Sequence, residues 1–213
     1  NIVIFTGGSG NLELARNLSA LNKRTKNISV DFIINGYDDG KSTGFLRKLV
    51  PGMLGPSDFR KNCSNLLRSN NPREETLKEI IEFRIKNFSM YSKLIKKLEK
   101  KDKHPFNFID QLPWNKYLNL IELMRIFNSY LKKQKFNKKN FLDVSLGNIL
   151  FTAIFLKKKN NFNLTIKSFS KFFEIDHNIH NVTDGKNLFL CALTSDGSFL
   201  KDEVSIIENK KKE

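Results

Sequence analysis

A glycine-rich turn near the start of the sequence is the first group of residues suited to chemistry. It consists of Gly7, Gly8, Ser9, Gly10 and Asn11. An apolar run, Ile2 to Phe5, precedes it and apolar residues at helical spacing follow it, which predicts a strand, a tight turn and a helix. The first N–H groups of a helix lack intrahelical partners and carry partial positive charge, which suits a phosphate. Glu13 stands where a dinucleotide site needs its third glycine, which argues against an ordinary NAD site.

A second loop, from Asn35 to Gly44, carries two adjacent carboxylates, Asp38 and Asp39. Adjacent side chains point in different directions, so we expect one to bind magnesium or a ribose hydroxyl and the other to cap the next turn. A solvated acidic turn is the alternative. Lys41 and Ser42 follow as candidate phosphate contacts, although the loop lacks the earlier glycine of a P-loop. We therefore take Asp38 and Asp39 as the candidate metal ligands and catalytic residues.

A third polar string stands at a predicted helix start, where Ser57 or Asp58 is the expected cap. Arg60 and Asn62 follow as candidate phosphate ligands. A guanidinium group matches two phosphate oxygens, so Arg60 is suited to grip a phosphate in a fork.

A fourth string opens an apolar helix that we expect from Asp143 to Leu156, buried on more than one side. Asp143 or Ser145 is its expected cap. Gly147 and Asn148 follow in its first turn and offer N–H groups and an amide at another helix start.

The elements that position these loops form an α/β pattern. A second strand, expected over 28–34, gives a β-α-β start, and parallel pairing needs the intervening helix as a crossover. Ligands in open α/β sheets bind beyond the carboxyl ends of the strands, where both the glycine turn and the Asp38 loop lie. We expect a single Rossmann-like, three-layer domain over 1–213 with a mostly parallel sheet.

The rest of the chain predicts helices and a late hairpin. Apolar residues at helical spacing over 74–101 and again after Pro113 indicate an antiparallel helical pair joined at 102–104. A further amphipathic helix is expected over 164–173. Strand-like runs at 187–194 and 199–207, joined by the turn at 195–198, indicate a hairpin.

The chain carries a formal net charge of +15, and the excess is concentrated in its middle. Residues 73–140 hold 17 Lys and Arg against 8 Asp and Glu. A basic module that binds RNA or an acidic partner is therefore one hypothesis. The abundance of Lys, Asn, Ile and Phe is also typical of a genome biased towards A and T codons, and no nucleic-acid-binding motif is present, so we do not expect nucleic acid as the partner.

Other features bound the location and the redox state. No run approaches the roughly 20 apolar residues of a membrane helix, so we expect no membrane partner and a cytoplasmic protein. Cys63 and Cys191 have no metal-type spacing and are expected to be reduced thiols. His177 and His180 share no clear helix face and are not expected to bind zinc.

Taken in order, the four strings resemble the 2-phospho-L-lactate transferase (CofD) family, and more closely its gluconeogenesis-factor (YvcK-like) branch. The Gly7–Asn11 turn is similar to Gly-Gly-Gly-Thr-Gly, and residues 38–47 are similar to Asp-Asp-Gly-Gly-Ser-Ser-Gly-Arg-Leu-Arg. Residues 55–62 resemble Pro-Pro-Gly-Asp-Ile-Arg-Asn with one insertion. Residues 144–150 resemble the Gly-His-Ser-Val-Gly-Asn-Leu-Leu string, and residues 181–184 a Pro-Val-Thr-Asp strand end.

The resemblance implies a site for a nucleotide diphosphate, either a GDP-linked donor or a UDP-sugar. It implies transfer of a phospholactyl-type group with magnesium as cofactor, or, as the alternative, a non-catalytic regulator that senses nucleotide sugars. The basic helical segment over 73–140 is longer than is usual for the branch and is expected to be an insertion. The family's C-terminal half has no counterpart after Ile207, so we expect a truncated member or a fragment, and a homo-oligomer is left open.

Overall fold

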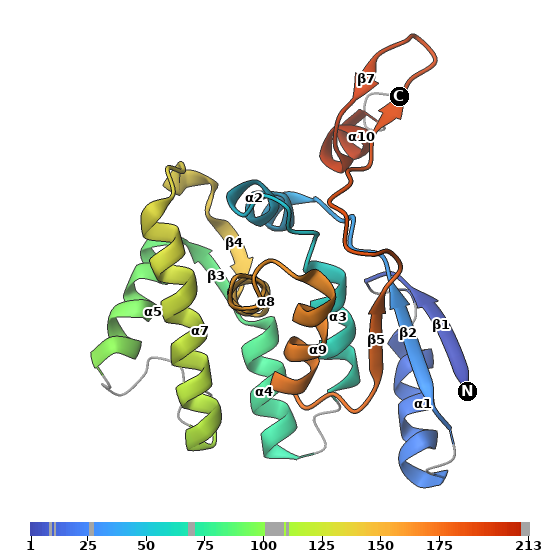
Figure 1. Cartoon of the computed structure of the whole chain (residues 1–213), viewed down its shortest axis with the longest axis vertical. Coiled ribbons are helices and arrows are strands. Elements are labelled where there is room, and N and C mark those ends of the chain that lie inside the picture. The colour runs from blue at the N-terminus through green and yellow to red at the C-terminus, as the bar shows by residue number, and fades with distance from the viewer. Residues whose placement is uncertain are drawn as a thin grey trace.

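A small parallel sheet lies on one side of the molecule (Figure 1). The computed structural model describes residues 1–8, 10, 12–25, 28–67, 71–100, 109 and 111–209. Strands β1 (Ile2–Thr6), β2 (Val30–Ile34) and β5 (Asn178–Asn181) form this sheet in the order β1-β2-β5. The buried side chains of Ile4, Phe32 and Ile179 stand side by side across it. The predicted α/β class with a parallel sheet is confirmed.

Most helices of the described residues lie to one side of this sheet, and the C-terminal segment drawn in red projects away from the rest (Figure 1). On the other face of the edge strand β1, Val3 and Phe5 are 57% and 71% exposed. The helices are α1 (Leu12–Thr25), α2 (Lys41–Leu49), α3 (Ser57–Leu66), α4 (Pro72–Glu82), α5 (Phe88–Lys100), α7 (Trp114–Lys133), the 3-10 helix η1 (Lys138–Asn140), α8 (Leu146–Lys157), α9 (Phe162–Phe172) and α10 (Glu203–Asn209).

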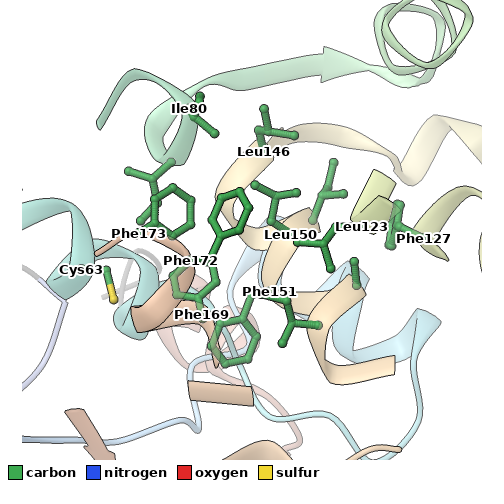
Figure 2. Close-up of a cluster of buried hydrophobic side chains, with 14 of the residues drawn as sticks. Cys63, Ile80, Leu123, Phe127, Leu146, Leu150, Phe151, Phe169, Phe172 and Phe173 are labelled. Atoms are coloured by element: carbon green, nitrogen blue, oxygen red, sulfur yellow. The ribbon is translucent and has the colours of Figure 1, made fainter. Parts of the chain in front are cut away.

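Helix α8 forms the centre of the core, as its apolar sequence predicts. Its residues from Leu146 to Phe155 are all buried, and it packs against α3, α4, α7 and α9. The ring of Phe151 lies 5.3 and 5.1 Å from those of Phe162 and Phe169 on α9 (Figure 2). Because neighbours surround α8, the polar residues at its first turn are held in a fixed place.

The prediction of a single helix over 74–101 is wrong in the middle of that range. Helix α4 ends at Glu82, and strand β3 (Arg84–Asn87) pairs antiparallel with β4 (Leu142–Ser145) before α5 begins. Ile85 and Val144 are opposite each other and buried. Helical periodicity cannot reveal a strand whose partner lies far along the chain, and here the cross-strand contacts outweigh local preference.

The expected helix start at Asp143 is also wrong. Asp143 lies in β4 with a φ of 47°, and its carboxylate pairs with Arg84 at 2.7 Å and Lys86 at 3.2 Å. Helix α8 begins three residues later, and the Ser145 side chain accepts a hydrogen bond from the Asn148 N–H at 3.1 Å. Of the two expected caps, Ser145 is therefore confirmed.

Helices α5 and α7 pack together and run antiparallel, as expected (Figure 1). The predicted joint at 102–104 lies outside the described residues. Helix α9 agrees with the amphipathic helix expected over 164–173.

The late hairpin is confirmed only at its turn. Strands β6 (Ala192–Leu193) and β7 (Phe199–Leu200) pair antiparallel around 195–198. The stretch from Glu203 is the helix α10 rather than a strand. The Asp202 carboxylate accepts a bond from the Ser205 N–H at 2.9 Å, and this capping contact favours the helix.

Candidate functional site

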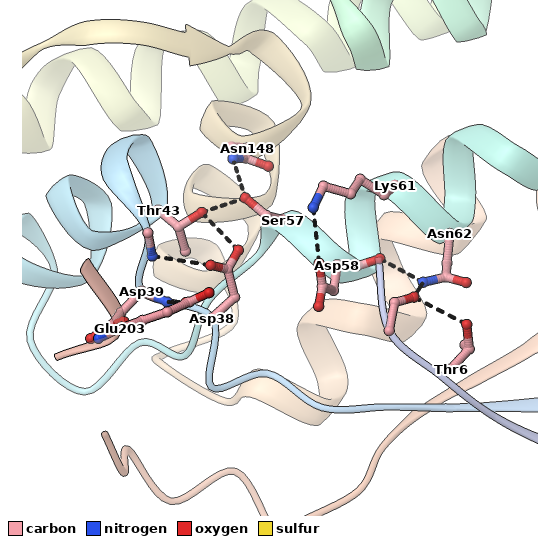
Figure 3. Close-up of polar contacts among 12 residues, drawn as sticks. Thr6, Asp38, Asp39, Thr43, Ser57, Asp58, Lys61, Asn62, Asn148 and Glu203 are labelled. Carbon is pink, nitrogen blue, oxygen red and sulfur yellow. Dashed lines mark hydrogen bonds and ion pairs between the residues drawn. The ribbon is translucent and has the colours of Figure 1, made fainter. Parts of the chain in front are cut away.

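The glycine turn leaves β1 and is fastened to helix α3. The Asn62 side chain donates to the carbonyl oxygens of Gly7, at 2.8 Å, and Asp58, at 2.9 Å (Figure 3). A Cβ on Gly8 would meet the side chains of Asp58 and Lys61, whereas one on Gly7 or Gly10 would have no atom of the described residues within 4 Å apart from its own chain neighbours. The turn is thus tightly held on its α3 side and open at Gly7 and Gly10. Ser9 and Asn11 lie outside the described residues.

A chain of hydrogen bonds joins the Asp38 loop to the starts of three helices (Figure 3). The Asp38 carboxylate accepts from the Gly40 N–H at 3.0 Å and from the Thr43 hydroxyl at 3.2 Å. Thr43, in the first turn of α2, also pairs with the hydroxyl of Ser57, the first residue of α3. The Asn148 side chain, in the first turn of α8, donates to the same Ser57 hydroxyl at 3.0 Å. The N-terminal turns of α2, α3 and α8 therefore meet at one place.

Two glycines permit this close approach. A Cβ on Gly55 would overlap the carbonyl oxygen of Asp38, and one on Gly147 would lie 2.5 Å from the carbonyl oxygen of Ile81 and 2.9 Å from Cγ of Arg60. Backbone atoms cannot give way as a flexible side-chain end can. Gly55 and Gly147 thus bring α3 against the Asp38 loop and α8 against Arg60.

The two adjacent carboxylates diverge, as the sequence predicts. Asp39 is 6% exposed and binds the start of α10: its carboxylate accepts from the Glu203 N–H at 3.1 Å. In return the Asp39 N–H donates to the Glu203 carboxylate at 3.2 Å. Asp39 thus caps a helix at the far end of the chain, whereas the turn that follows the pair is capped by Asp38, which accepts from the Gly40 N–H. Asp38 is the carboxylate directed at α2 and α3.

Burial sets the charge balance around this network. Burial raises the pKa of Asp58, while Lys61, 3.2 Å away, opposes the rise. Burial also raises the pKa of Glu203, which has Asp38 and Asp39 beside it. Burial lowers the pKa of Arg60, and the negative charges of Glu82, Asp58 and Asp38 oppose that shift. Several carboxylates and the half-buried guanidinium of Arg60 thus share a partly desolvated region.

Among the residues that the sequence predicts as ligands, two buried polar atoms have no hydrogen-bond partner within the described part of the chain. They are Nε of Arg60 and Oδ1 of Asn148. Buried polar atoms are normally paired, because an unsatisfied one costs about 1–3 kcal/mol. Both atoms belong to residues that the sequence singled out for ligand binding.

The structure places the other predicted residues as follows. Ser42 is half-buried and lines a cavity of about 690 Å³ together with Asp39, Phe45 and Lys48. Lys41 begins α2, and its side chain is outside the described part of the chain. Asn62 is 4% exposed, and its amide holds the glycine turn instead of facing open space.

The expected cap at Ser57 or Asp58 is wrong. Pro56 is the capping residue of α3, without a side-chain hydrogen bond, and the Ser57 hydroxyl joins Thr43 and Asn148 instead. The sequence analysis therefore missed the roles of Thr43 and Ser57. Their hydroxyl groups stand in strings that it singled out, but nothing in those strings shows that the two meet.

Arg47 is a further residue that the sequence analysis missed. It is 2% exposed, and its guanidinium donates to the carbonyl oxygen of Tyr37 at 3.0 Å and to those of Leu188 at 2.6 Å and Asp38 at 3.4 Å. It also stacks on the ring of Phe189, with its Cζ 4.0 Å from the ring centroid. Arg47 thus fastens the segment after β5 to the Asp38 loop.

The predicted site residues fit a magnesium ion only if a bound ligand also contributes oxygen atoms to the ion. Within the described ranges, no group of three or more His, Cys, Asp or Glu residues is placed to hold a metal. Mg²⁺ in proteins is commonly held by one or two carboxylates together with substrate phosphates and water. Asp38 offers one such carboxylate beside the three helix starts.

The fold and the loop arrangement define a Rossmann-like α/β protein with polar loops gathered around three helix starts. The sequence model described as 2-phospho-L-lactate transferase CofD matches residues 2–213. The chain therefore belongs to the CofD family.

Two further comparisons place the chain. A crystal structure of a UPF0052 family protein from Bacillus halodurans matches with a TM-score of 0.54 and 20% identity. That match covers 98% of this chain and 47% of the other, so this chain spans about half the length of that protein. No curated protein matches the sequence. Among the described residues, no helix has the length and apolar character required to cross a membrane.

Proposed function

We propose that the glycine turn and the starts of α2, α3 and α8 bind the diphosphate group of a nucleotide. The observation that carries this proposal is the hydrogen-bonded chain from Asp38 through Thr43 and Ser57 to Asn148, which holds three helix N-termini together. Each helix start carries partial positive charge from the helix dipole. At α8 the N–H groups of Leu146 and Asn148 are already bonded, to the Phe83 carbonyl oxygen and the Ser145 hydroxyl, so α8 contributes mainly through its dipole. Anions bind well at such ends, and several ends at one place suit a doubly charged pyrophosphate.

Individual residues have distinct roles in this proposal. Gly7 and Gly10 leave backbone open for a phosphate to approach. Arg60 supplies a guanidinium whose Nε has no partner among the described residues. The unpartnered side-chain oxygen of Asn148 is an acceptor, so it suits a hydroxyl group of the nucleotide rather than a phosphate oxygen. Lys41 and Ser42 remain candidate contacts at the start of α2. Asn62 acts indirectly, because it fixes the glycine turn.

We further propose that the bound nucleotide is the donor in a phospholactyl-type transfer. An alcohol oxygen attacks the distal phosphorus of the diphosphate, the bond to the bridging oxygen breaks, and a nucleoside monophosphate leaves. In this proposal Asp38 accepts the alcohol proton, and Arg60 stabilises negative charge on the phosphoryl oxygens. Magnesium, shared between Asp38 and the phosphates, would neutralise phosphate charge.

A second candidate function, in the gluconeogenesis-factor branch, is nucleotide-sugar binding without turnover. The observation that favours it is that Asp39 is hydrogen-bonded to Glu203. Of the two adjacent carboxylates, Asp38 is then the one that lies at the helix starts. In that case the same residues bind the diphosphate, and the protein senses the nucleotide sugar without transferring any part of it.

Isothermal titration calorimetry tests both candidates. GDP and a UDP-sugar are titrated with and without magnesium into the wild-type chain and Arg60→Gln. The matched control is Arg125→Gln, which changes an exposed arginine on α7. We expect binding that Arg60→Gln weakens by about tenfold, as for the loss of a charged hydrogen bond, and that the control leaves unchanged. An absence of heat with every nucleotide, or equal effects of the two variants, would contradict the proposal.

A further inference from the structure

A groove between α5 and α7 lies outside the site described above. It has a volume of about 640 Å³, and its floor is apolar: Phe88, Tyr91, Ile95, Leu131 and Phe136. Four exposed lysines stand around it: Lys96, Lys132, Lys135 and Lys138. No acidic residue is among its lining residues. The groove therefore combines an apolar floor with a rim of a single charge sign.

Ring contacts hold the floor of this α5–α7 groove in place. The Phe88 ring centroid lies 5.7 Å from that of Phe136 and 5.9 Å from that of Tyr91. Nζ of Lys138 lies 5.2 Å from the centroid of Phe88, so the rim packs on the floor. Tyr91 and Leu131 are buried, whereas Phe88 and Phe136 are half-buried and can contact an incoming apolar side chain. The groove is preformed and needs no rearrangement to accept one.

We propose that the α5–α7 groove binds a short acidic amphipathic helix of a partner protein. Charge complementarity is the argument: four lysines without a lining carboxylate match acidic side chains, while the floor matches an apolar stripe. The lining residues of α5 run from Phe88 to Lys96, which corresponds to about 12 Å of helix. This length accommodates about two turns of a partner helix, with apolar residues spaced three and four apart on the floor.

The basic segment that the sequence analysis singled out supports this choice of partner. Lys132, Lys135 and Lys138, at the end of α7 and just after it, face the same groove as Lys96 of α5, which lies more than thirty residues earlier in the sequence. Single-stranded RNA binds where successive bases stack on open aromatic faces. In this floor Tyr91 is buried, and Phe88 and Phe136 are half-buried and pack edge to face on each other with an interplanar angle of 68°, so little ring face is open to bases. A helix with acidic flanks uses both features at once.

A designed peptide tests the proposal on the full chain. The probe is a fluorescein-labelled peptide of about 14 residues, with leucines at helical spacing and glutamates on both flanks. Its binding is followed by fluorescence anisotropy, with a scrambled peptide of the same composition alongside. We expect the amphipathic peptide to bind at least about tenfold more tightly than the scrambled one, and raised salt to weaken it.

Substitutions in the α5–α7 groove test whether the peptide binds there. Lys132→Glu with Lys135→Glu should weaken the peptide at least about tenfold, because like charges then face its glutamates. The matched control is Lys158→Glu with Lys167→Glu, which reverses two exposed lysines at the end of α8 and on α9 and should change little. Phe136→Ala should also weaken binding, which distinguishes insertion into the floor from attraction by charge alone.

Several outcomes would overturn the proposal. They are equal binding of the two peptides, equal losses in the groove and control variants, and no loss with Phe136→Ala. The proposal would also be overturned if a short single-stranded RNA or palmitate displaced the labelled peptide at a lower concentration than the unlabelled peptide does, because that would favour another occupant of the groove. Circular dichroism spectra of all variants confirm that each one is folded.

Discussion

Replacing Ser57 with alanine should destabilise the protein through the network at the starts of α2, α3 and α8. Ser57 is 7% exposed, and its hydroxyl contacts the Thr43 hydroxyl and the Asn148 amide. The substitution removes two hydrogen bonds, each worth about 1 kcal/mol, and leaves the buried amide donor unpaired at a cost of about 1–3 kcal/mol. Alanine's better helix propensity offsets roughly 0.5 kcal/mol. We expect the free energy of unfolding to fall by about 2.5–4.5 kcal/mol.

A double-mutant cycle separates this network from general packing effects. Ser57→Ala, Asn148→Ala and the double variant are unfolded with urea and followed by far-ultraviolet circular dichroism. Because the two side chains are in contact, their losses should differ from additivity by about 1 kcal/mol or more. Ser92→Ala is the control, since that hydroxyl bonds to the Phe88 carbonyl in its own helix, and should change the free energy by less than about 0.5 kcal/mol.

Two results would refute the reasoning. One is that the losses at Ser57 and Asn148 add to within about 0.5 kcal/mol, which indicates independent sites. The other is a loss in Ser57→Ala no larger than in Ser92→Ala. Either would show that the hydroxyl does not hold the helix starts together.

Three other predictions follow from the structure. Gly55→Ala should lower the free energy of unfolding by about 1–3 kcal/mol in urea, because its Cβ overlaps a backbone carbonyl, while Gly7→Ala, with open space around it, should be neutral or slightly stabilising; equal effects would contradict the close approach. Burial raises the pKa of Cys63 to about 12, so a thiol reagent should label exposed Cys191 in the folded chain and Cys63 only in denaturant, and fast labelling of both would be inconsistent with the fold. Burial raises the pKa of Asp58, so its charge disfavours the folded state as pH rises above the ordinary value of 3.8; Asp58→Asn should be more stabilising, or less destabilising, relative to wild type at pH 7 than at pH 4, and the reverse trend in urea unfolding would contradict this.

Local sequence signals predicted much of the first part of the fold. The apolar run before Gly7 and the helical spacing after it defined β1 and α1, and the alternating burial of 30–34 agrees with the second strand. The burial of α8 followed from its uninterrupted apolar sequence. These features depend on neighbouring residues, so periodicity and turn chemistry were sufficient to find them.

The features that were missed depend on contacts between distant segments. Strand β3 exists because it pairs with β4, and α10 begins where Asp39, 164 residues earlier, caps Glu203. In the same way, the meeting of Thr43, Ser57 and Asn148 needs the packing of three helices. The sequence indicated which polar strings to examine, but not which hydroxyl groups and amides in them touch.

The most direct test of the central claim is a nuclear magnetic resonance titration of the isotope-labelled chain with GDP and magnesium. We predict that the backbone amides of Gly7, Gly10 and Gly40 and those of the first turns of α3 and α8 shift together with a single affinity. The amide resonances of α5 and α9 should keep their chemical shifts. Shifts spread over the basic surface of α5 and α7, or no shift at the glycine turn and the helix starts, would contradict a diphosphate site at this edge of the sheet.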